Sequence, residues 1–328
     1  MAELLIIHEG ANDKFWVDEA RNFLTGVILY VHQFCPPEKR TIAEVRNLLT
    51  QGKEEFEVFV MGDMGESENP QVKKSANMFL AAEDKVKSNI TSTLNSQMGI
   101  WDSQKLAKVM GKTTVRFDLL KESSNTIFLS IPPDKLKTYA PLVRLFMGIC
   151  INILTKSEVK PKLPVLFMLD EFPALGYMKV IEEKISYLAG YGINLWIFVQ
   201  DLKQLKSIYK DSADSIISNC YVKQFFGVSD HDTAKYVSDL CGTTTIPQKN
   251  FSTSHNKDNL TWGDGVSSTA GQLMSPSEVM NMPEHLQLIF FMNQQPVRAK
   301  KIPYYGYPNF FSDDALGVMF RDNPFFNT

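Results

Sequence analysis

The sequence predicts an α/β protein with a mostly parallel sheet and a separate all-α region in front of it. Residues 10–110 place apolar side chains at helical spacing, whereas residues 111–328 alternate short apolar runs with helices. Runs that are apolar on both faces are typical of parallel strands covered on two sides by helices. We therefore expect two structural parts, an all-α domain at 10–110 and a sheet-containing part at 111–328.

The first part is predicted to consist of amphipathic helices. Apolar residues recur three and four positions apart through the longest of them. Thr41 and Glu44 have the spacing of a capping box, which marks a helix start. The predicted helices are residues 14–33, 42–49, 70–100 and 103–110, with a loop at 63–69.

The second part is predicted to alternate strands and helices. Its continuous apolar runs are short enough for buried strands and are bounded by proline, glycine or polar residues. The predicted strands are residues 126–131, 164–169, 194–199, 221–226 and 286–292, and the predicted helices are 140–154 and 180–189. Residues 247–270 are rich in Ser, Thr, Asn and Gly, which predicts a mobile loop.

Charge and composition exclude several classes of protein. Hydrophobic residues make up 44% and charged residues 22%, with a formal net charge of −3, so no global basic field attracts nucleic acid. The four scattered cysteines contain no C-x-x-C pair, which argues against a disulfide framework or a zinc site. The apolar helix at 140–154 is too short to cross a bilayer, and no signal peptide precedes it. We expect a soluble cytoplasmic chain without a membrane segment.

The strongest chemical signal is a pair of acids, Asp170 and Glu171, directly after the apolar run 164–169. Open α/β sheets place ligands just beyond the carboxyl ends of their strands. An Asp there can hold Mg²⁺ through water, and the adjacent Glu can polarise a water for attack on a terminal phosphate. This is the Walker B pattern of an ATPase. The alternative is that the two acids only cap the following turn.

A polar amide, Gln200, follows the next predicted strand and so would lie near the acids. Such an amide can sense a γ-phosphate or orient an attacking water, although it can also simply bond the loop. Further along, Lys203, Lys206 and Lys210 recur at helical spacing. They could face a DNA channel, but a solvated helix face is the favoured interpretation.

Several spaced segments resemble one family in the right order. Asp170-Glu-Phe-Pro-Ala-Leu-Gly176, Tyr187-Leu-Ala-Gly-Tyr-Gly192 and Phe198-Val-Gln-Asp-Leu202 are similar to the core of the TraG/TraD-type coupling proteins of type IV secretion. The resemblance extends over nearly the whole chain. It includes Phe15-Trp16, Ala20-Arg-Asn22 and Thr25-Gly26, Ile131-Pro-Pro-Asp134, Phe226-Gly-Val-Ser-Asp230, Gly242-Thr-Thr244, and Arg298-Ala-Lys-Lys301 with Tyr304-Tyr305.

The resemblance implies half of a RecA-like P-loop NTPase with an inserted all-α domain. It implies ATP and Mg²⁺ as cofactors, with Asp170 on the Mg²⁺ side, Glu171 as catalytic base and Gln200 as nucleotide sensor. It further implies a homo-hexamer at the cytoplasmic face of the bacterial inner membrane. That hexamer would use ATP hydrolysis to pump a DNA–relaxase complex or protein effectors into the channel, in contact with other type IV secretion components.

The family's phosphate-binding loop, G-x-x-x-x-G-K-[ST], is not found in the 328 residues. Gly111-Lys-Thr113 has part of the pattern, but position 106 is Leu106 where the loop needs glycine, and the segment follows a predicted helix. Cofactor binding by this chain alone is therefore in question. Two alternatives remain open, a catalytically inert truncated remnant of such a protein and a distant FtsK-like or AAA+ DNA motor.

Overall fold

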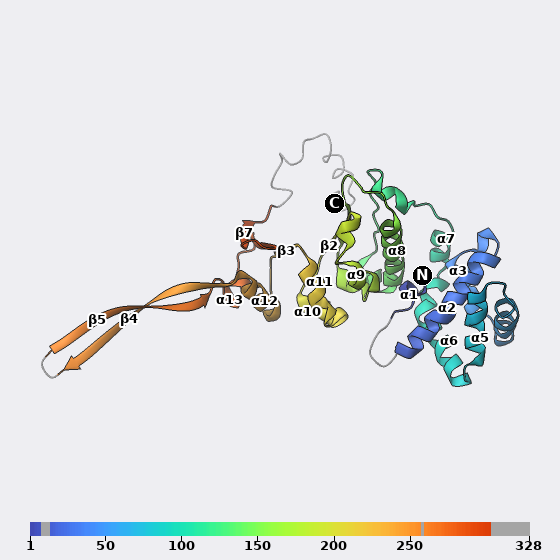
Figure 1. Cartoon of the computed structure of the whole chain (residues 1–328), viewed down its shortest axis with the longest axis horizontal. Coiled ribbons are helices and arrows are strands. Elements are labelled where there is room, and N and C mark those ends of the chain that lie inside the picture. The colour runs from blue at the N-terminus through green and yellow to red at the C-terminus, as the bar shows by residue number, and fades with distance from the viewer. Residues whose placement is uncertain (8–13, 257–258, 303–328) are drawn as a thin grey trace. The chain divides into compact units, whose positions relative to one another are not determined.

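The computed structural model describes residues 1–7, 14–256 and 259–302. The described chain divides into two compact units. The first contains residues 1–200 and 204–216, and the second contains residues 201–203 and those from 217 onward. Figure 1 follows the elements of both units along the chain.

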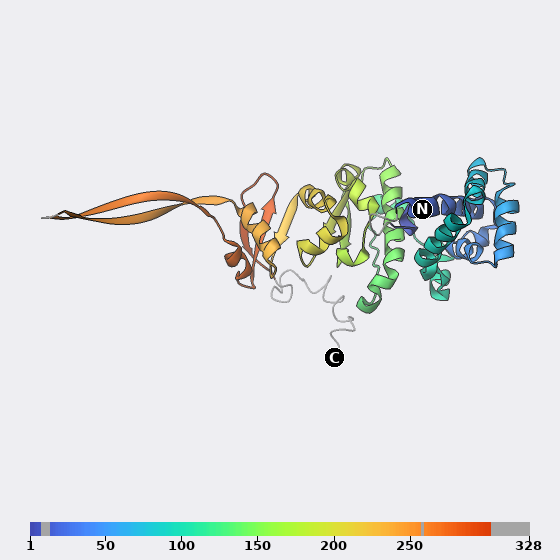
Figure 2. The same ribbon diagram turned by 90° about the horizontal axis from the view of Figure 1, so that it is seen from below.

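The first unit begins with helices that share one apolar core. They are α1 (Ala2–Leu5), α2 (Lys14–Phe34), α3 (Ile42–Leu49), α4 (Lys53–Val58), α5 (Pro70–Ala81), α6 (Asp84–Met98) and α7 (Gln104–Met110). Helix α2 lies at the centre, with α5 and α6 packed beside it in both views (Figures 1 and 2). Its buried residues Ala20, Leu24, Val27 and Val31 recur at helical spacing, as the sequence pattern predicts.

Two features of this helical region differ from the prediction. The single helix expected at 70–100 is broken, because Ala82 and Glu83 adopt extended backbone conformations between α5 and α6. The loop predicted at 63–69 begins later than expected, since α4 runs directly into a π-helix at Phe59–Met64 that takes in the first two of its residues. The helix start predicted at Thr41 is confirmed, because Thr41 Oγ1 accepts a hydrogen bond of 3.2 Å from the Glu44 amide.

A buried arginine ties three of these elements together. The Arg46 guanidinium, from α3, donates to both carboxylate oxygens of Asp102 at 2.8 and 2.9 Å and to Asn95 Oδ1 of α6 at 2.8 Å. The Arg46 side chain is only 8% exposed, whereas Asp102 is 55% exposed. Such a planar, bidentate contact fixes the relative orientation of the helices as well as neutralising the buried charge.

A long helix, α8 (Leu136–Lys156), connects the helical region to the sheet. Gly148 of α8 lies so close to Leu4 of α1 that an added Cβ would sit 2.4 Å from the Leu4 side chain. The helix is longer than the 140–154 predicted, so the expectation that it is too short to cross a bilayer is wrong: by length and hydropathy, residues 133–156 would suffice to span a membrane. Half of their most apolar 18-residue stretch is, however, buried inside the protein. Core helices of soluble proteins have the same properties, so this is weak evidence for a membrane span.

The sheet of the first unit is a parallel pair, β1 (Val165–Leu169) and β2 (Ile193–Ile197). Between the two strands lie α9 (Lys179–Lys184) and two short 3₁₀ turns, so the helix expected at 180–189 is shorter than predicted. The strand expected at 126–131 is not formed. No described strand pairs with these residues, and without a neighbouring ladder an extended segment has no strand hydrogen bonds. Its Phe128 side chain is 83% exposed.

The second unit contains an antiparallel sheet in the order β3 (Val222–Phe225), β6 (Leu286–Phe291) and β7 (Val297–Lys300). Helices α12 (His231–Cys241) and α13 (Pro276–Met280) cover it through the apolar core formed by Val237, Val279, Leu288 and Phe290. The described strands thus form three separate sheets, one of them the hairpin β4–β5 (Thr243–Asn256 and Asn259–Gln272). Parallel pairing holds for β1 and β2, and the other described strands pair antiparallel.

The predicted loop at 247–270 is wrong, because the structure forms a long hairpin there. Strands β4 (Thr243–Asn256) and β5 (Asn259–Gln272) pair antiparallel from Thr243–Gln272 to Asn256–Asn259. Figure 2 shows the two strands running side by side with the usual twist. The segment lacks the alternation of apolar and polar residues that marks a half-buried strand, so its pattern resembled a loop. Backbone pairing between the two strands stabilises the hairpin, although its sequence has no alternating apolar pattern.

The Arg46–Asp102 contact makes stability depend on pH. The Arg46 hydrogen bond, chiefly, holds the pKa of Asp102 below its usual value. A lowered carboxylate pKa stabilises the fold above the unfolded pKa of about 3.9, and this stabilisation is lost as the pH falls through the lower folded pKa. At pH 7 we expect Asp102→Asn to lower the free energy of unfolding by about 1 kcal/mol, because solvent screens the half-exposed carboxylate. Below pH 4 the difference from wild type should shrink.

Thermal unfolding between pH 7 and pH 2.5 measures this effect. Asp84→Asn is the matched control, since Asp84 is a fully exposed acid on α6 that meets Lys87 only at 3.7 Å. A deficit in Asp102→Asn that stayed constant down to pH 2.5 would contradict the assignment.

Candidate functional site

The candidate site lies where β1 and β2 end. The parallel register pairs Leu169 with Ile197 as its last rung. Two further backbone bonds continue the pairing beyond the strands, from the Phe198 amide to the Leu169 carbonyl at 3.1 Å and from the Phe172 amide to the Phe198 carbonyl at 3.2 Å. The residues that follow both strands are therefore held next to each other, as expected for the carboxyl edge of a parallel sheet.

The two acids occupy a tight turn directly after β1. Glu171 has φ 48° and ψ 42°, the left-handed conformation that side chains other than glycine adopt at a cost of about 1–2 kcal/mol. Its amide donates to Asp170 Oδ1 at 3.1 Å. Both acids are exposed to solvent. The turn thus sends the chain back into a 3₁₀ helix at Phe172–Leu175 while it leaves both carboxylates at the open edge.

Gln200 meets this turn from β2. Its Nε2 donates a hydrogen bond of 2.9 Å to Glu171 Oε1. On its other side, Gln204 Nε2 approaches Gln200 Oε1 at 3.4 Å. The structure therefore brings together Glu171 and Gln200, two of the residues selected from the sequence, with the third, Asp170, beside them.

Two buried side chains behind the turn, Tyr209 and Arg144, hold it in place. Phe172 is fully buried and stacks on the Tyr209 ring, with the ring centres 5.7 Å apart and the planes 11° from parallel. The Tyr209 hydroxyl accepts a hydrogen bond from the Met178 amide, and burial, chiefly, raises the pKa of Tyr209. Arg144 of α8 donates to the Leu175 carbonyl at 2.8 Å.

Sequence reasoning did not assign either support. Arg144 is a buried charge in an otherwise apolar helix, and it stands out in the sequence only as the interruption of the run at 140–154. Tyr209 lies in α10 (Leu202–Tyr209) and carries no local signal. Their importance follows from packing that only the fold reveals.

The other residues singled out in the sequence are not part of the turn that carries the two acids. Gly111 follows the end of α7 with a right-handed helical backbone, so Gly111-Lys112-Thr113 does not form a loop between a strand and a helix. Lys203, Lys206 and Lys210 are exposed, and Lys206 pairs with Asp214 at 3.1 Å. Tyr304 and Tyr305, which contributed to the family resemblance, lie outside the described residues.

The donors at the turn suit a hard cation better than a transition metal. Asp170, Glu171 and Gln200 offer carboxylate and amide oxygens, which Mg²⁺ prefers, and leave room for the waters that it retains. No group of three or more His, Cys, Asp or Glu gathers as a metal site within the described residues. A cation here would consequently be held through one or two carboxylates and water.

Comparison with known proteins identifies relatives over almost the entire chain. The family model described as type IV secretory system conjugative DNA transfer matches residues 1–320. The conjugal transfer protein TraG of Escherichia coli is 28% identical over 308 residues, which cover 86% of this chain and 48% of TraG. Protein VirD4 of Agrobacterium fabrum is 25% identical over 328 residues, which cover 98% of this chain and 47% of VirD4. The chain spans about half the length of these curated relatives.

Solved structures show the same fold. The unbound bacterial conjugative coupling protein TrwBdeltaN70 matches with a TM-score of 0.73 at 13% identity, covering 92% of this chain and 66% of that one. TrwB in complex with the non-hydrolysable ATP analogue ADPNP matches with a TM-score of 0.70 at 14% identity, covering 91% and 66%. TrwB in complex with ADP and Mg²⁺ matches with a TM-score of 0.70 at 13% identity over the same shares.

The Arg144 contact yields a prediction about the turn. Arg144→Met keeps the apolar stem but leaves the buried Leu175 carbonyl without this donor, which should cost about 1–3 kcal/mol. Hydrogen exchange at the Gly176 and Met178 amides should become faster, because both belong to the segment that Arg144 anchors. Hydrogen exchange with mass spectrometry measures both effects.

Arg116→Met is the matched control, since Arg116 is exposed and donates to its near neighbour Asp118 at 2.9 Å. Equal exchange rates at Gly176 and Met178 in the two variants would show that Arg144 does not anchor the turn.

Proposed function

Because this chain belongs to the type IV secretory system conjugative DNA transfer family, we propose that it supplies the hydrolytic side of a coupling ATPase's nucleotide site. The observation that carries the proposal is the hydrogen bond of 2.9 Å between Gln200 and Glu171 at the ends of two parallel strands, with Asp170 adjacent. A pair of turn-capping acids would need neither this partner nor a left-handed glutamate.

Each residue has a separate role in this proposal. Asp170 would hold Mg²⁺ through water, and that cation would neutralise charge on the phosphates. Glu171 accepts a proton from the attacking water, and its strained backbone keeps the carboxylate at the edge of the sheet. Gln200 orients the Glu171 carboxylate and senses the terminal phosphate. ATP with Mg²⁺, when bound, would supply the phosphoryl group and the cation.

The phosphate-binding loop must be supplied by residues other than these 328, because no G-x-x-x-x-G-K-[ST] pattern occurs among them. Support for ATP and Mg²⁺ comes from TrwB, whose structures contain ADPNP in one case and ADP with Mg²⁺ in another. Since the chain spans about half of TraG and of VirD4, the proposed working unit is a larger protein.

We propose that this unit is a homo-hexamer at the inner membrane that transfers a DNA–relaxase complex or protein effectors to the other secretion components. The proposal keeps the division into an all-α domain at 10–110 and an ATPase part at 111–328. Its support is that the described residues of the first range form helices only, whereas the described strands all follow residue 164.

The chain alone should bind ATP weakly and hydrolyse it at the background rate, because its sequence lacks the G-x-x-x-x-G-K-[ST] loop whose amide nest and lysine hold β- and γ-phosphates. A steady-state phosphate-release assay with Mg²⁺ measures this. Robust turnover that disappears in Glu171→Gln would contradict the prediction and would require a phosphate site elsewhere in the chain.

The roles of the two residues are tested in a protein that joins this chain at Met1 to a segment carrying the phosphate loop. Glu171→Gln should lower kcat by about 100-fold or more while ATP binding is retained, because the amide keeps the shape but cannot accept a proton. Gln200→Ala should lower kcat more than it weakens binding, because its contact matters most in the transition state.

Glu158→Gln is the control, since Glu158 is an exposed acid in the segment between α8 and β1. If both site variants matched this control in kcat, the assignment would be refuted. A joined protein that binds ATP but does not hydrolyse it would favour the alternative that this chain is a catalytically inert remnant.

A further inference from the structure

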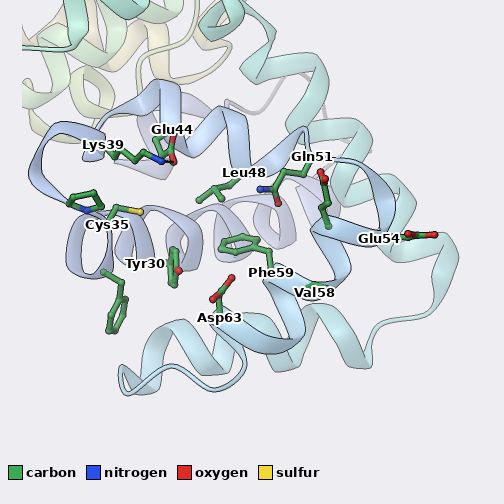
Figure 3. A pocket seen from close by; sticks show the side chains of 13 residues that line it. Tyr30, Cys35, Lys39, Glu44, Leu48, Gln51, Glu54, Val58, Phe59 and Asp63 are labelled. Carbon is green, nitrogen blue, oxygen red and sulfur yellow. Dashed lines mark ion pairs between the residues drawn. The ribbon is translucent and has the colours of Figure 1, made fainter.

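The all-α region contains a hollow that the proposed ATPase chemistry does not use. It has a volume of about 520 Å³, within the usual range for ligand pockets of roughly 300–1,000 Å³. Its walls come from the end of α2, from α3, and from α4 with the π-helix that follows it. Figure 3 shows the side chains that line it.

The floor of this hollow is aromatic. Tyr30 lies 5.1 Å from Phe59 in an edge-to-face arrangement and 5.5 Å from Phe34, measured between ring centres. Phe59 is buried at 3% exposure and fixes the cluster, whereas the Phe34 ring is 43% exposed at the mouth. Aromatic faces carry negative electrostatic potential and attract cations.

The rim of the hollow is acidic. Four carboxylates line it, Glu44, Glu54, Glu55 and Asp63, against one cation, Lys39. Lys39 pairs with Glu44 at 3.6 Å (Figure 3). Glu54, Glu55 and Asp63 form no ion pair with any described residue. Three negative charges therefore remain uncompensated around an aromatic floor.

Besides burial, the acidic side chains of the rim also act on two side chains of the hollow, Tyr30 and Cys35, whose pKa values they raise. Burial raises the pKa of Tyr30, and the Asp63 carboxylate raises it further. Burial likewise raises the pKa of Cys35, and Glu44 and Asp63 add to this, against the opposite effect of Lys39 and Arg40. Arg40 also donates to the Cys35 carbonyl at 2.9 Å.

We propose that this hollow binds an arginine side chain of a basic peptide segment, with the guanidinium against the Tyr30 and Phe34 rings and facing Asp63. A guanidinium is planar, stacks on aromatic rings, and donates in pairs to carboxylates, so it satisfies both the floor and the rim. Nucleic acid does not fit, because its phosphates would meet three uncompensated carboxylates. The partner is thus a protein, and this inference does not depend on the ATPase proposal.

Binding is tested on the full chain with a fluorescein-labelled peptide containing alternating Arg and Gly, by fluorescence anisotropy at low salt. A peptide with citrulline in place of Arg has nearly the same shape without charge and should not bind. A Lys peptide should bind several-fold more weakly, because an ammonium lacks the planar fork. Added salt should weaken binding of the Arg peptide, since the rim is exposed.

Variants locate the site. Asp63→Asn and Phe34→Ala should each weaken Arg-peptide binding by about 3–10-fold, the range for one exposed ionic or cation–π contact. Both residues are exposed, so neither change removes core packing. Glu57→Gln is the matched control, an exposed acid of α4 outside the hollow, and should bind as wild type does.

Three results would overturn the proposal. The citrulline peptide could bind as tightly as the Arg peptide, or Asp63→Asn and Phe34→Ala could both bind like Glu57→Gln. A short single-stranded DNA that competes with the Arg peptide and loses affinity in the same two variants would instead make the hollow a nucleic-acid contact.

Discussion

Five residue pairs hold β1 and β2 parallel and in register, from Val165–Ile193 to Leu169–Ile197, and the geometry of the site depends on this pairing. It brings Glu171 and Gln200, 29 positions apart, within a hydrogen bond of 2.9 Å. A slip of one residue would displace one strand end by about 3.3 Å and turn alternate side chains to the other face. Such a slip would break the Gln200–Glu171 hydrogen bond. The geometry of the site therefore requires this strand register.

The turn after β1 is rigid on its buried side and open on the other. Phe172 stacks on Tyr209 and the Leu175 carbonyl accepts from Arg144, while Asp170, Glu171 and Gln200 face solvent. Rigid support behind exposed polar groups is what a catalytic site requires, because charges act best when they need not reorganise. The open side is where the proposed cation and nucleotide would bind.

The parallel pair and the acids were predictable because each has a local cause, an apolar run that ends in polar residues. The fold class and the family followed from several such segments in order. The hairpin at 243–272 was missed, and a strand at 126–131 was wrongly expected, because strand formation depends on a partner that local hydrophobicity does not reveal. Arg144 and Tyr209 were missed because their roles arise from packing between distant segments. The roles of Asp170, Glu171 and Gln200 stay predictions.

The central claim is that these three residues form the metal and nucleotide side of the site, and paramagnetic broadening tests it most directly. Mn²⁺ replaces Mg²⁺ at oxygen ligands, and its effect on nuclear magnetic resonance signals is detectable even for weak binding. With Mn²⁺ and ADP, the amide signals of residues 169–172 and 198–200 should broaden first, and Asp170→Asn should abolish this. Broadening that persists in Asp170→Asn, or that is centred on the acidic hollow around Asp63, would contradict the account.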